Sequence, residues 1–389
     1  MSAAGLPRPD ERRGLHRLLP AAMAAVRGGE QALLPLPADL RGVAVLVVDG
    51  LGHHQLEAHA DLAPTLAGAR RVVCDAPFPT TTATSLTSIG TGLPPGRHGI
   101  VGYSFAVPGE RRPLFALTWS LGAHDPTLDA TDLLVPERLQ PEPTVFDRGR
   151  GLGIRPVTVL REEFVTSGLT RAGLRGGDIR VANGLQATLE AIATALAGSG
   201  PTLVYAHHGD LDTIGHLTGP GSEAWCEELT RIDGAVSGLV DRLPTATALV
   251  VTADHGMVGV PEAGFVELAE RPELLAGDAV LTGDPRARQL HVEPAARDEL
   301  LAAWREHAGT RAHVLTREEA IAAGWFGPEV TEEAARRIGD VIVCARVLDA
   351  AWVHRDLDLL GGRLPGLHGA LTPEEMHVPA IVFGAQASP

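Results

Sequence analysis

Six acidic and histidine side chains stand where strands are predicted to end, and their types suit the binding of metal ions. They are Asp49, Asp212, His216, Asp254, His255 and His368. Three carboxylates with three imidazoles suit zinc, with manganese as the alternative, better than calcium or magnesium. Six protein ligands are too many for one tetrahedral ion, so two ions are the natural count. Two ions about 3.5–4 Å apart can hold both the attacking and the leaving oxygen of an in-line displacement.

The spacing of these residues is consistent with shared ligation. Asp212 and His216 are four residues apart, so one helical turn would place both side chains on the same side, where they can bind one ion. The neighbours Asp254 and His255 would point to opposite faces of a regular strand. They converge only if the backbone turns there, and we expect Gly256 to permit that turn.

Thr82 is the candidate nucleophile. It follows Pro79 and is predicted to begin a helix that ends near residues 90–92. The free amides and the dipole at a helix N-terminus favour an alkoxide and an incoming phosphoryl group, and a neighbouring metal ion would lower the pKa of the hydroxyl. The alternative is that the threonines at 80, 81, 82 and 84 only cap the helix. Without the six metal-binding residues, the capping interpretation would be favoured.

Strands that alternate with helices must position these groups. Continuous apolar runs predict buried strands at 43–48, 202–206 and 247–252, and further strands are predicted at 71–76, 155–160 and 377–383. Helices are predicted at 11–27, 55–69, 184–196 and 222–243. The pattern predicts an α/β fold with a mostly parallel central sheet sandwiched by helices. Ligands of such sheets gather at the carboxyl ends of strands, where Asp49, the loop 207–216 and Asp254 are expected.

The character of the chain changes between residues 258 and 364. Short strands are predicted at 279–282, 289–292 and 341–346, and helices at 295–307 and 317–323. We interpret this part as an inserted α+β lid or subdomain. The catalytic core would then comprise residues 30–257 and 365–389, preceded by an N-terminal helical extension over residues 1–29.

The composition argues against several classes of protein. The formal net charge of −15 opposes binding of a nucleic-acid polymer through a basic surface. Cys74, Cys226 and Cys344 are far apart and form no Cys-x-x-Cys pair, which favours reduced thiols in a cytoplasm. No signal-peptide pattern and no apolar run of about 20 residues is found, so no membrane association is expected. The sequence leaves the oligomeric state open.

Six segments in order resemble motifs of the nucleotide pyrophosphatase/phosphodiesterase (type I phosphodiesterase) family of the alkaline phosphatase superfamily. They are VVDGL at 47–51, FPTTT at 78–82 continuing to GTGL at 90–93, HGIVG at 98–102, DTIGH at 212–216, TADHGM at 252–257 and LHG at 367–369. Each segment is weak alone, but six in the family's order over residues 43–383 are highly specific. The resemblance implies an alkaline phosphatase-like core.

The resemblance also implies a role for each matching residue. One zinc ion would be held by Asp212, His216 and His368, and the other by Asp49, Asp254 and His255, with Thr82 alongside the second ion. Thr82 would attack phosphorus and form a covalent phospho-threonine intermediate, which water then hydrolyses. Tyr103 departs from the pattern, because it stands where the family usually has an asparagine that touches a phosphoryl oxygen. Its hydroxyl could donate a similar hydrogen bond to substrate.

The expected function is hydrolysis of a phosphodiester or pyrophosphate bond in a small organic phosphate, such as a nucleotide. The alternative is a phosphomonoesterase or phosphonate hydrolase with the same site, since Tyr103 puts the diester preference in question. The complete ligand set argues against a non-catalytic binding protein. For the remaining polar residues, we expect Arg286 and Arg288 at the surface. His207 and His208 are interpreted either as neighbours of the ligands or as simple loop packing.

Overall fold

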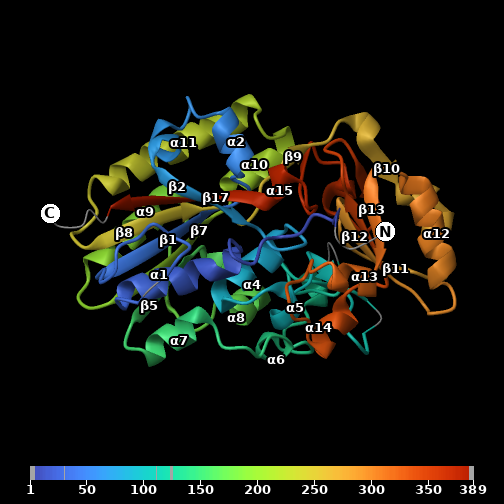
Figure 1. Ribbon diagram of the computed structural model, residues 1–389, viewed down its shortest axis with the longest axis horizontal. Helices are drawn as coiled ribbons and strands as arrows, with labels where there is room; N and C mark the ends of the chain where they lie inside the picture. Colours follow the sequence, from blue (N-terminus) through green and yellow to red (C-terminus); the bar gives the residue numbers. More distant parts are fainter. Residues whose placement is uncertain (1–4, 30, 111, 123–125, 385–389) are drawn as a thin grey trace.

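The computed structural model describes residues 5–29, 31–110, 112–122 and 126–384, and a seven-stranded sheet forms its centre (Figure 1). Strand β1 (Gly42–Val48) is apolar throughout and fully buried, as a central strand must be. The strand order is β2-β17-β8-β1-β7-β5-β6. The other bounds are β2 (Arg70–Asp75), β5 (Arg155–Leu160), β6 (Asp178–Val181), β7 (Thr202–His208), β8 (Thr247–Thr252) and β17 (His377–Gly384).

The register of the parallel strands brings their carboxyl ends to one edge. Val48 of β1 pairs with His208 of β7, and Val47 pairs with Thr252 of β8. Strands β5, β6, β7, β1 and β8 are mutually parallel, whereas β17 runs antiparallel to both β8 and β2. The predicted α/β fold with a mostly parallel sheet is therefore confirmed. Residues directly after β1, β7 and β8 lie next to one another.

Helices cover both faces of the sheet (Figure 1). Helices α1 (Leu18–Val26), α4 (Thr82–Thr91) and α7 (Val145–Gly151) lie on one side, and α9 (Leu185–Ala197) and α11 (Glu223–Val240) on the other. The single helix predicted at 55–69 is wrong. It is divided into α2 (His53–Ala58) and α3 (Pro64–Gly68), because Pro64 cannot donate to a helix that continues through it and instead begins a new one.

A second, antiparallel sheet lies beside the first. Its order is β11-β12-β14-β13, with bounds β11 (Val280–Asp284), β12 (Ala287–His291), β13 (Ala312–Thr316) and β14 (Val341–Ala345). Helices α12 (Arg297–Ala308), α13 (Arg317–Ala322) and α14 (Glu332–Arg337) accompany it. The hydrophobic cluster of this small sheet includes Phe78, Ala83 and Ile100. The small sheet therefore packs directly against the segment that contains Thr82.

Shorter elements complete the described part of the chain. They are β3 (Ser104–Phe105), β4 (Leu114–Phe115), α5 (Pro95–His98), α6 (Pro136–Leu139), α8 (Gly168–Gly173), α10 (Asp210–Thr218), β9 (Val258–Gly259), β10 (Phe265–Glu267), β15 (Ala351–Val353), β16 (Gly366–Leu367) and α15 (Pro373–Met376). Cys74, Cys226 and Cys344 are free thiols. None of the helices described combines the length and apolar character needed to cross a membrane.

Candidate metal centre and active site

Three histidine rings at the carboxyl ends of the strands are held in the same way, with Nδ1 against a backbone carbonyl oxygen. The Nδ1 atoms of His216, His368 and His255 lie 2.7, 2.8 and 3.1 Å from the backbone carbonyl oxygens of Gly366, Thr80 and Gly256. Because a carbonyl oxygen can only accept a hydrogen bond, each Nδ1 carries a proton, and Nε2 is the ring nitrogen that remains available to bind a metal ion. This is the arrangement that a metal-binding histidine needs.

The first group of predicted ligands consists of Asp212, His216 and His368. The Nε2 atoms of the two histidines are 3.2 Å apart, and Asp212 Oδ2 is 3.4 Å from His216 Nε2. Burial, followed by the neighbouring imidazoles, lowers the pKa of His368 well below its usual value, so the ring is neutral. The two imidazole nitrogens and the carboxylate lie within 4.8 Å of one another, so one cation can contact all three. The donor set therefore fits a divalent ion.

Asp212 and His216 lie on a helix rather than on the loop predicted at 207–216. Helix α10 begins at Asp210, two residues after β7 ends, and the four-residue spacing falls on one of its turns. The preceding strand is also longer than predicted, because His207 and His208 still pair with β1. The predicted loop therefore shrinks to a tight connection, which fixes both ligands on a regular element.

The second group consists of Asp49, Asp254 and His255, and all three are buried. His255 Nε2 lies 3.4 Å from Asp49 Oδ1 and 3.5 Å from Asp254 Oδ2, and neither of these oxygens has a hydrogen-bond partner. Burial, and then the charges of Asp254 and Asp212, raise the pKa of Asp49 well above its usual value. Buried carboxylate oxygens without partners are costly, and a divalent cation would supply the missing partner. This set also fits a metal ion.

Gly256 is required for a different reason from the one predicted. Its backbone is not in the left-handed region that favours glycine. A Cβ atom there would instead lie 2.0 Å from the carbonyl oxygen of Glu374 and 3.0 Å from the Cα atom of Gly52. Glycine therefore allows three backbone segments to meet directly behind His255.

The two histidines at the end of β7 point to opposite faces, as strand alternation requires. His207 Nε2 lies 3.0 Å from Asp49 Oδ2, so it holds one oxygen of that predicted ligand while the other faces the site. His208 Nε2 lies 2.9 Å from Glu228 of α11, and Arg231 also binds Glu228. His207 is thus a neighbour of the ligands, whereas His208 belongs to the packing between β7 and α11.

Each threonine of the run at 80–82 contacts a different part of the molecule. Thr80 Oγ1 donates to Ala370 O, Thr81 Oγ1 donates to Asp284 Oδ1 at 3.0 Å, and Thr82 Oγ1 lies 3.2 Å from His255 Nε2. No side chain caps helix α4, which begins at Thr82. The capping interpretation is therefore wrong, and the hydroxyl of Thr82 is directed toward the predicted ligands at the N-terminus of a ten-residue helix.

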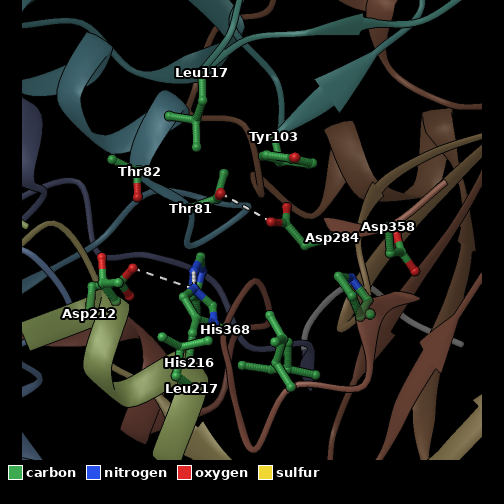
Figure 2. A pocket seen from close by; sticks show the side chains of 15 residues that line it. Thr81, Thr82, Tyr103, Leu117, Asp212, His216, Leu217, Asp284, Asp358 and His368 are labelled. Atoms are coloured by element: carbon green, nitrogen blue, oxygen red, sulfur yellow. Dashed lines mark hydrogen bonds and ion pairs between the residues drawn. The ribbon is translucent and has the colours of Figure 1, made fainter. Parts of the chain in front are cut away.

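Thr82 opens onto a cavity of about 330 Å³ between the central sheet and the small sheet. Figure 2 shows Thr81 between Thr82 and Asp284, with Leu117 and Tyr103 on the opposite side of the cavity from His216. The Tyr103 ring packs edge-on against Phe115 with ring centres 5.6 Å apart. Burial, followed by the charges of Asp284 and Asp358, raises the pKa of Tyr103 to about 12, so its hydroxyl keeps its proton.

The family model described as type I phosphodiesterase/nucleotide pyrophosphatase matches residues 43–354. The chain belongs to this family. The match contains the five segments at 47–51, 78–93, 98–102, 212–216 and 252–257 in full. His368 lies beyond it, so the last predicted ligand comes from the part of the chain outside the match.

Solved structures share the fold of this chain. Murine ectonucleotide pyrophosphatase/phosphodiesterase 5 superposes with a TM-score of 0.65 and 18% identity over 88% of both chains. Its inactive variant in complex with AMP superposes with a TM-score of 0.66 and 17% identity over 88% of this chain and 87% of that one. Phosphonoacetate hydrolase from Sinorhizobium meliloti 1021, in complex with phosphonoformate, superposes with a TM-score of 0.66 and 21% identity. The superposition covers 91% of this chain and 92% of the hydrolase.

Curated relatives match over a short stretch only. The catalytic subunit of GPI ethanolamine phosphate transferase 3 from Mus musculus is 36% identical over 69 residues, which are 18% of this chain and 6% of that protein. The human protein is 40% identical over 55 residues, which are 14% of this chain and 5% of the human protein. The chain thus matches about one-twentieth of the length of these relatives.

Sequence reasoning missed two features of the type I phosphodiesterase site. Asp284 enters the cavity from the small sheet, and the expected surface placement of Arg286 and Arg288 is wrong because both are buried. Arg286 pairs with Glu375, and Arg288 pairs with Asp358. In the sequence, Gly-Asp-Pro-Arg at 283–286 has the composition of an ordinary turn, so only the contacts between distant segments reveal these roles.

The buried carboxyl of Asp284 predicts a pH-dependent stability. Burial raises its pKa from 3.8 to about 7, against the opposing effects of the Thr81 hydrogen bond and the Arg288 charge. The pKa of Asp284 is higher in the folded protein than in the unfolded chain, so its protonated form favours folding. This contribution to the free energy of unfolding is complete below pH 3.8 and is lost as the pH rises toward 7. Asp284→Asn cannot ionise, so its gain in free energy of unfolding should grow with pH to at most about 4 kcal/mol at pH 8. Denaturant unfolding of the metal-free protein at pH 5.5 and 8 measures this gain, and an equal change at both values would contradict it.

Proposed function

We propose that this protein hydrolyses phosphodiester or pyrophosphate bonds of small organic phosphates, with two divalent ions, zinc by ligand type, and Thr82 as nucleophile. The observation that carries the proposal is that the Thr82 hydroxyl lies 3.2 Å from His255 Nε2 of one three-residue group and lines a cavity together with the other group, Asp212, His216 and His368. Membership of the type I phosphodiesterase family supports a metal-dependent phosphoester hydrolase. The AMP and phosphonoformate complexes of its structural neighbours support a small phosphorylated ligand.

We assign one ion to Asp212, His216 and His368, and the other to Asp49, Asp254 and His255, with Thr82 alongside the second. When bound, the ions supply Lewis acidity that lowers the pKa of the Thr82 hydroxyl and neutralises charge on the phosphoryl group. The backbone carbonyls at Nδ1 keep the three Nε2 lone pairs directed inward. His207 holds Asp49 in place through its Oδ2 atom.

Thr82 carries out the bond exchange. Its Oγ1 atom forms a bond to phosphorus while the bond from phosphorus to the leaving oxygen breaks, and the hydroxyl proton passes to solvent. Free amides in the first turn of α4 stabilise the charge on the attached phosphoryl oxygens. Water then attacks the phospho-threonine, the bond from phosphorus to Oγ1 breaks, and Thr82 recovers its proton. Tyr103 keeps its proton and lines the cavity, and we assign its hydroxyl as a donor to a phosphoryl oxygen.

A paired assay tests the proposed function. The zinc-supplied protein is compared on bis-p-nitrophenyl phosphate and p-nitrophenyl phosphate, each with and without chelator. We expect faster cleavage of the diester, abolished by the chelator and restored by zinc. Faster cleavage of the monoester would instead assign a phosphomonoesterase, with Tyr103 as the diverging position. A protein that binds two ions per chain and cleaves neither ester would contradict the proposal.

Metal binding should also stabilise the fold. The lone pairs and carboxylates of the two groups face one another without a counter-charge, so a ligand that binds only the folded state adds RT ln(1 + [L]/Kd) to the free energy of unfolding. At 100 times Kd, zinc is expected to add about 2.7 kcal/mol and to raise the melting temperature. The increase should be smaller for His368→Ala. An equal melting temperature with zinc and with chelator would show that the groups do not form a site.

A further inference from the structure

Thr82 lies between two cavities, not beside one. The first, which we call the Asp284 cavity, has a volume of about 330 Å³ and extends toward the small sheet. The second, which we call the Phe164 cavity, has a volume of about 290 Å³ and extends toward the segment after β5. Both are lined by Thr82, Asp212, Thr213 and Leu117. A substrate with two groups on phosphorus can therefore place one group on each side of Leu117.

The two cavities differ in charge. The Phe164 cavity contains a cation, Arg161, which is paired at 3.3 Å with Glu163, and both side chains are partly exposed. The proposed metal ligands Asp49 and Asp212 also line it. The described lining of the Asp284 cavity contains no arginine or lysine. Besides Asp284, two carboxylates line it: Asp212, a proposed metal ligand, lies 3.4 Å from His216 Nε2, and Asp358 pairs with the buried Arg288. Asp284 thus remains the carboxylate of this cavity without an ion-pair partner among the described residues.

Asp284 is directed into this cavity by the turn between β11 and β12 (Figure 2). Its Oδ1 atom accepts the hydrogen bond from Thr81, but its Oδ2 atom has no hydrogen-bond partner among the residues that the structure describes, and the residue is 5% exposed. Leucines and a proline form much of the surrounding wall, at positions 217, 285, 364 and 367. A carboxylate in such surroundings disfavours a second anion and favours a hydrogen-bond donor, most strongly a charged one.

We propose that Asp284 determines substrate specificity by admitting to its cavity an organic group with an ammonium and by excluding one with a carboxylate or a further phosphate. This inference rests on the proposed function, and it names the chemical class of one substituent of the substrate. Thr81 positions Asp284 through its hydroxyl. The Phe164 cavity receives the other group on phosphorus.

A matched pair of phosphonates tests the binding preference. Isothermal titration calorimetry of the zinc-loaded Thr82→Ala variant at pH 8.5, above the pKa of about 7 of Asp284, compares 2-aminoethylphosphonate with phosphonoacetate, which differ in the sign of the terminal charge. We expect the amine to bind at least about tenfold more tightly, the size of effect typical of a charge-assisted hydrogen bond. Adding Asp284→Asn should reduce the ratio to about twofold or less. The control Glu163→Gln, which removes a carboxylate from the Phe164 cavity, should leave the ratio unchanged.

Tighter or equal binding of phosphonoacetate to the protein with Asp284 intact would overturn the inference. So would a change of the ratio by Glu163→Gln as large as that by Asp284→Asn. If Asp284→Asn does not fold, the ratio of the two affinities in the protein that retains Asp284 still tests the inference. Turnover separates the two proposals, with 2-aminoethyl and carboxymethyl esters of p-nitrophenyl phosphate as substrates. Cleavage of both at equal kcat/KM would contradict the role of Asp284 alone, whereas cleavage of neither would contradict the proposed function.

Discussion

Replacing Thr82 with alanine is expected to lower kcat for a phosphodiester by about 10⁴-fold or more, because the covalent route loses its nucleophile. The variant should still bind two zinc ions per chain, since the six acidic and histidine residues of the two groups are unchanged. Steady-state kinetics and metal analysis of the same sample measure both quantities. Thr82→Ser keeps a hydroxyl at the N-terminus of α4, so it should retain part of the activity.

Thr84→Val is the matched control on the same helix. Thr84 is buried, and its hydroxyl has no hydrogen-bond partner, so a valine of similar shape should change kcat less than about twofold. Mass spectrometry after acid quench should find phosphate on Thr82 during turnover. Near-native activity of Thr82→Ala, or phosphate on another residue, would contradict the covalent mechanism.

The central sheet was predictable because the sequences of its inner strands are continuous apolar runs. Residues 43–48 and 247–252 are apolar or threonine throughout, which is typical of strands buried on both faces. Parallel strands then bring Asp49 and Asp254 to the same edge without any further information. The convergence of these two residues could therefore be predicted from local patterns and one topological rule.

The start of α10 was not predictable from the same patterns, whereas the division of the helix at 55–69 is indicated by Pro64. Asp210 begins a helix two residues after a strand ends, so the polar run at 207–216 resembles a loop in composition although residues 210–216 are helical. The small sheet was predicted only in part. Its strand β13 was missed because it is short and bounded by polar residues, and it is stabilised by pairing with β14.

The chemistry of the Asp284 cavity depends on how two sheets pack, which no local pattern records. Thr81 and Asp284 are 203 residues apart, yet their side chains share a hydrogen bond. The same packing buries Arg286 and Arg288, which a sequence pattern alone assigns to solvent because arginine is mostly exposed. Long-range partners, rather than residue type, decide these three positions.

Arg286 connects the small sheet to the segment that carries His368, so its loss is expected to destabilise the protein strongly. Its guanidinium donates two hydrogen bonds of 2.8 Å to Glu375 and three to the backbone carbonyls of Val347, Leu348 and Ala350. Both charged side chains are fully buried. Glu375 also accepts from the backbone N–H of Ala370, two residues after His368.

Arg286→Met should lower the free energy of unfolding by about 3–5 kcal/mol, because it leaves the buried Glu375 carboxylate without its counter-charge. Arg336→Met is the matched control, since Arg336 pairs with Glu332 at the surface and should cost less than about 1 kcal/mol. The double variant with Glu375→Gln should recover part of the loss, because no bare charge remains. Denaturant unfolding of the four proteins measures these differences. Arg286→Met should also bind zinc more weakly, since the loop before Glu375 holds a predicted ligand. A loss in free energy of unfolding no larger than that of Arg336→Met would mean that the two sheets are joined by apolar packing alone.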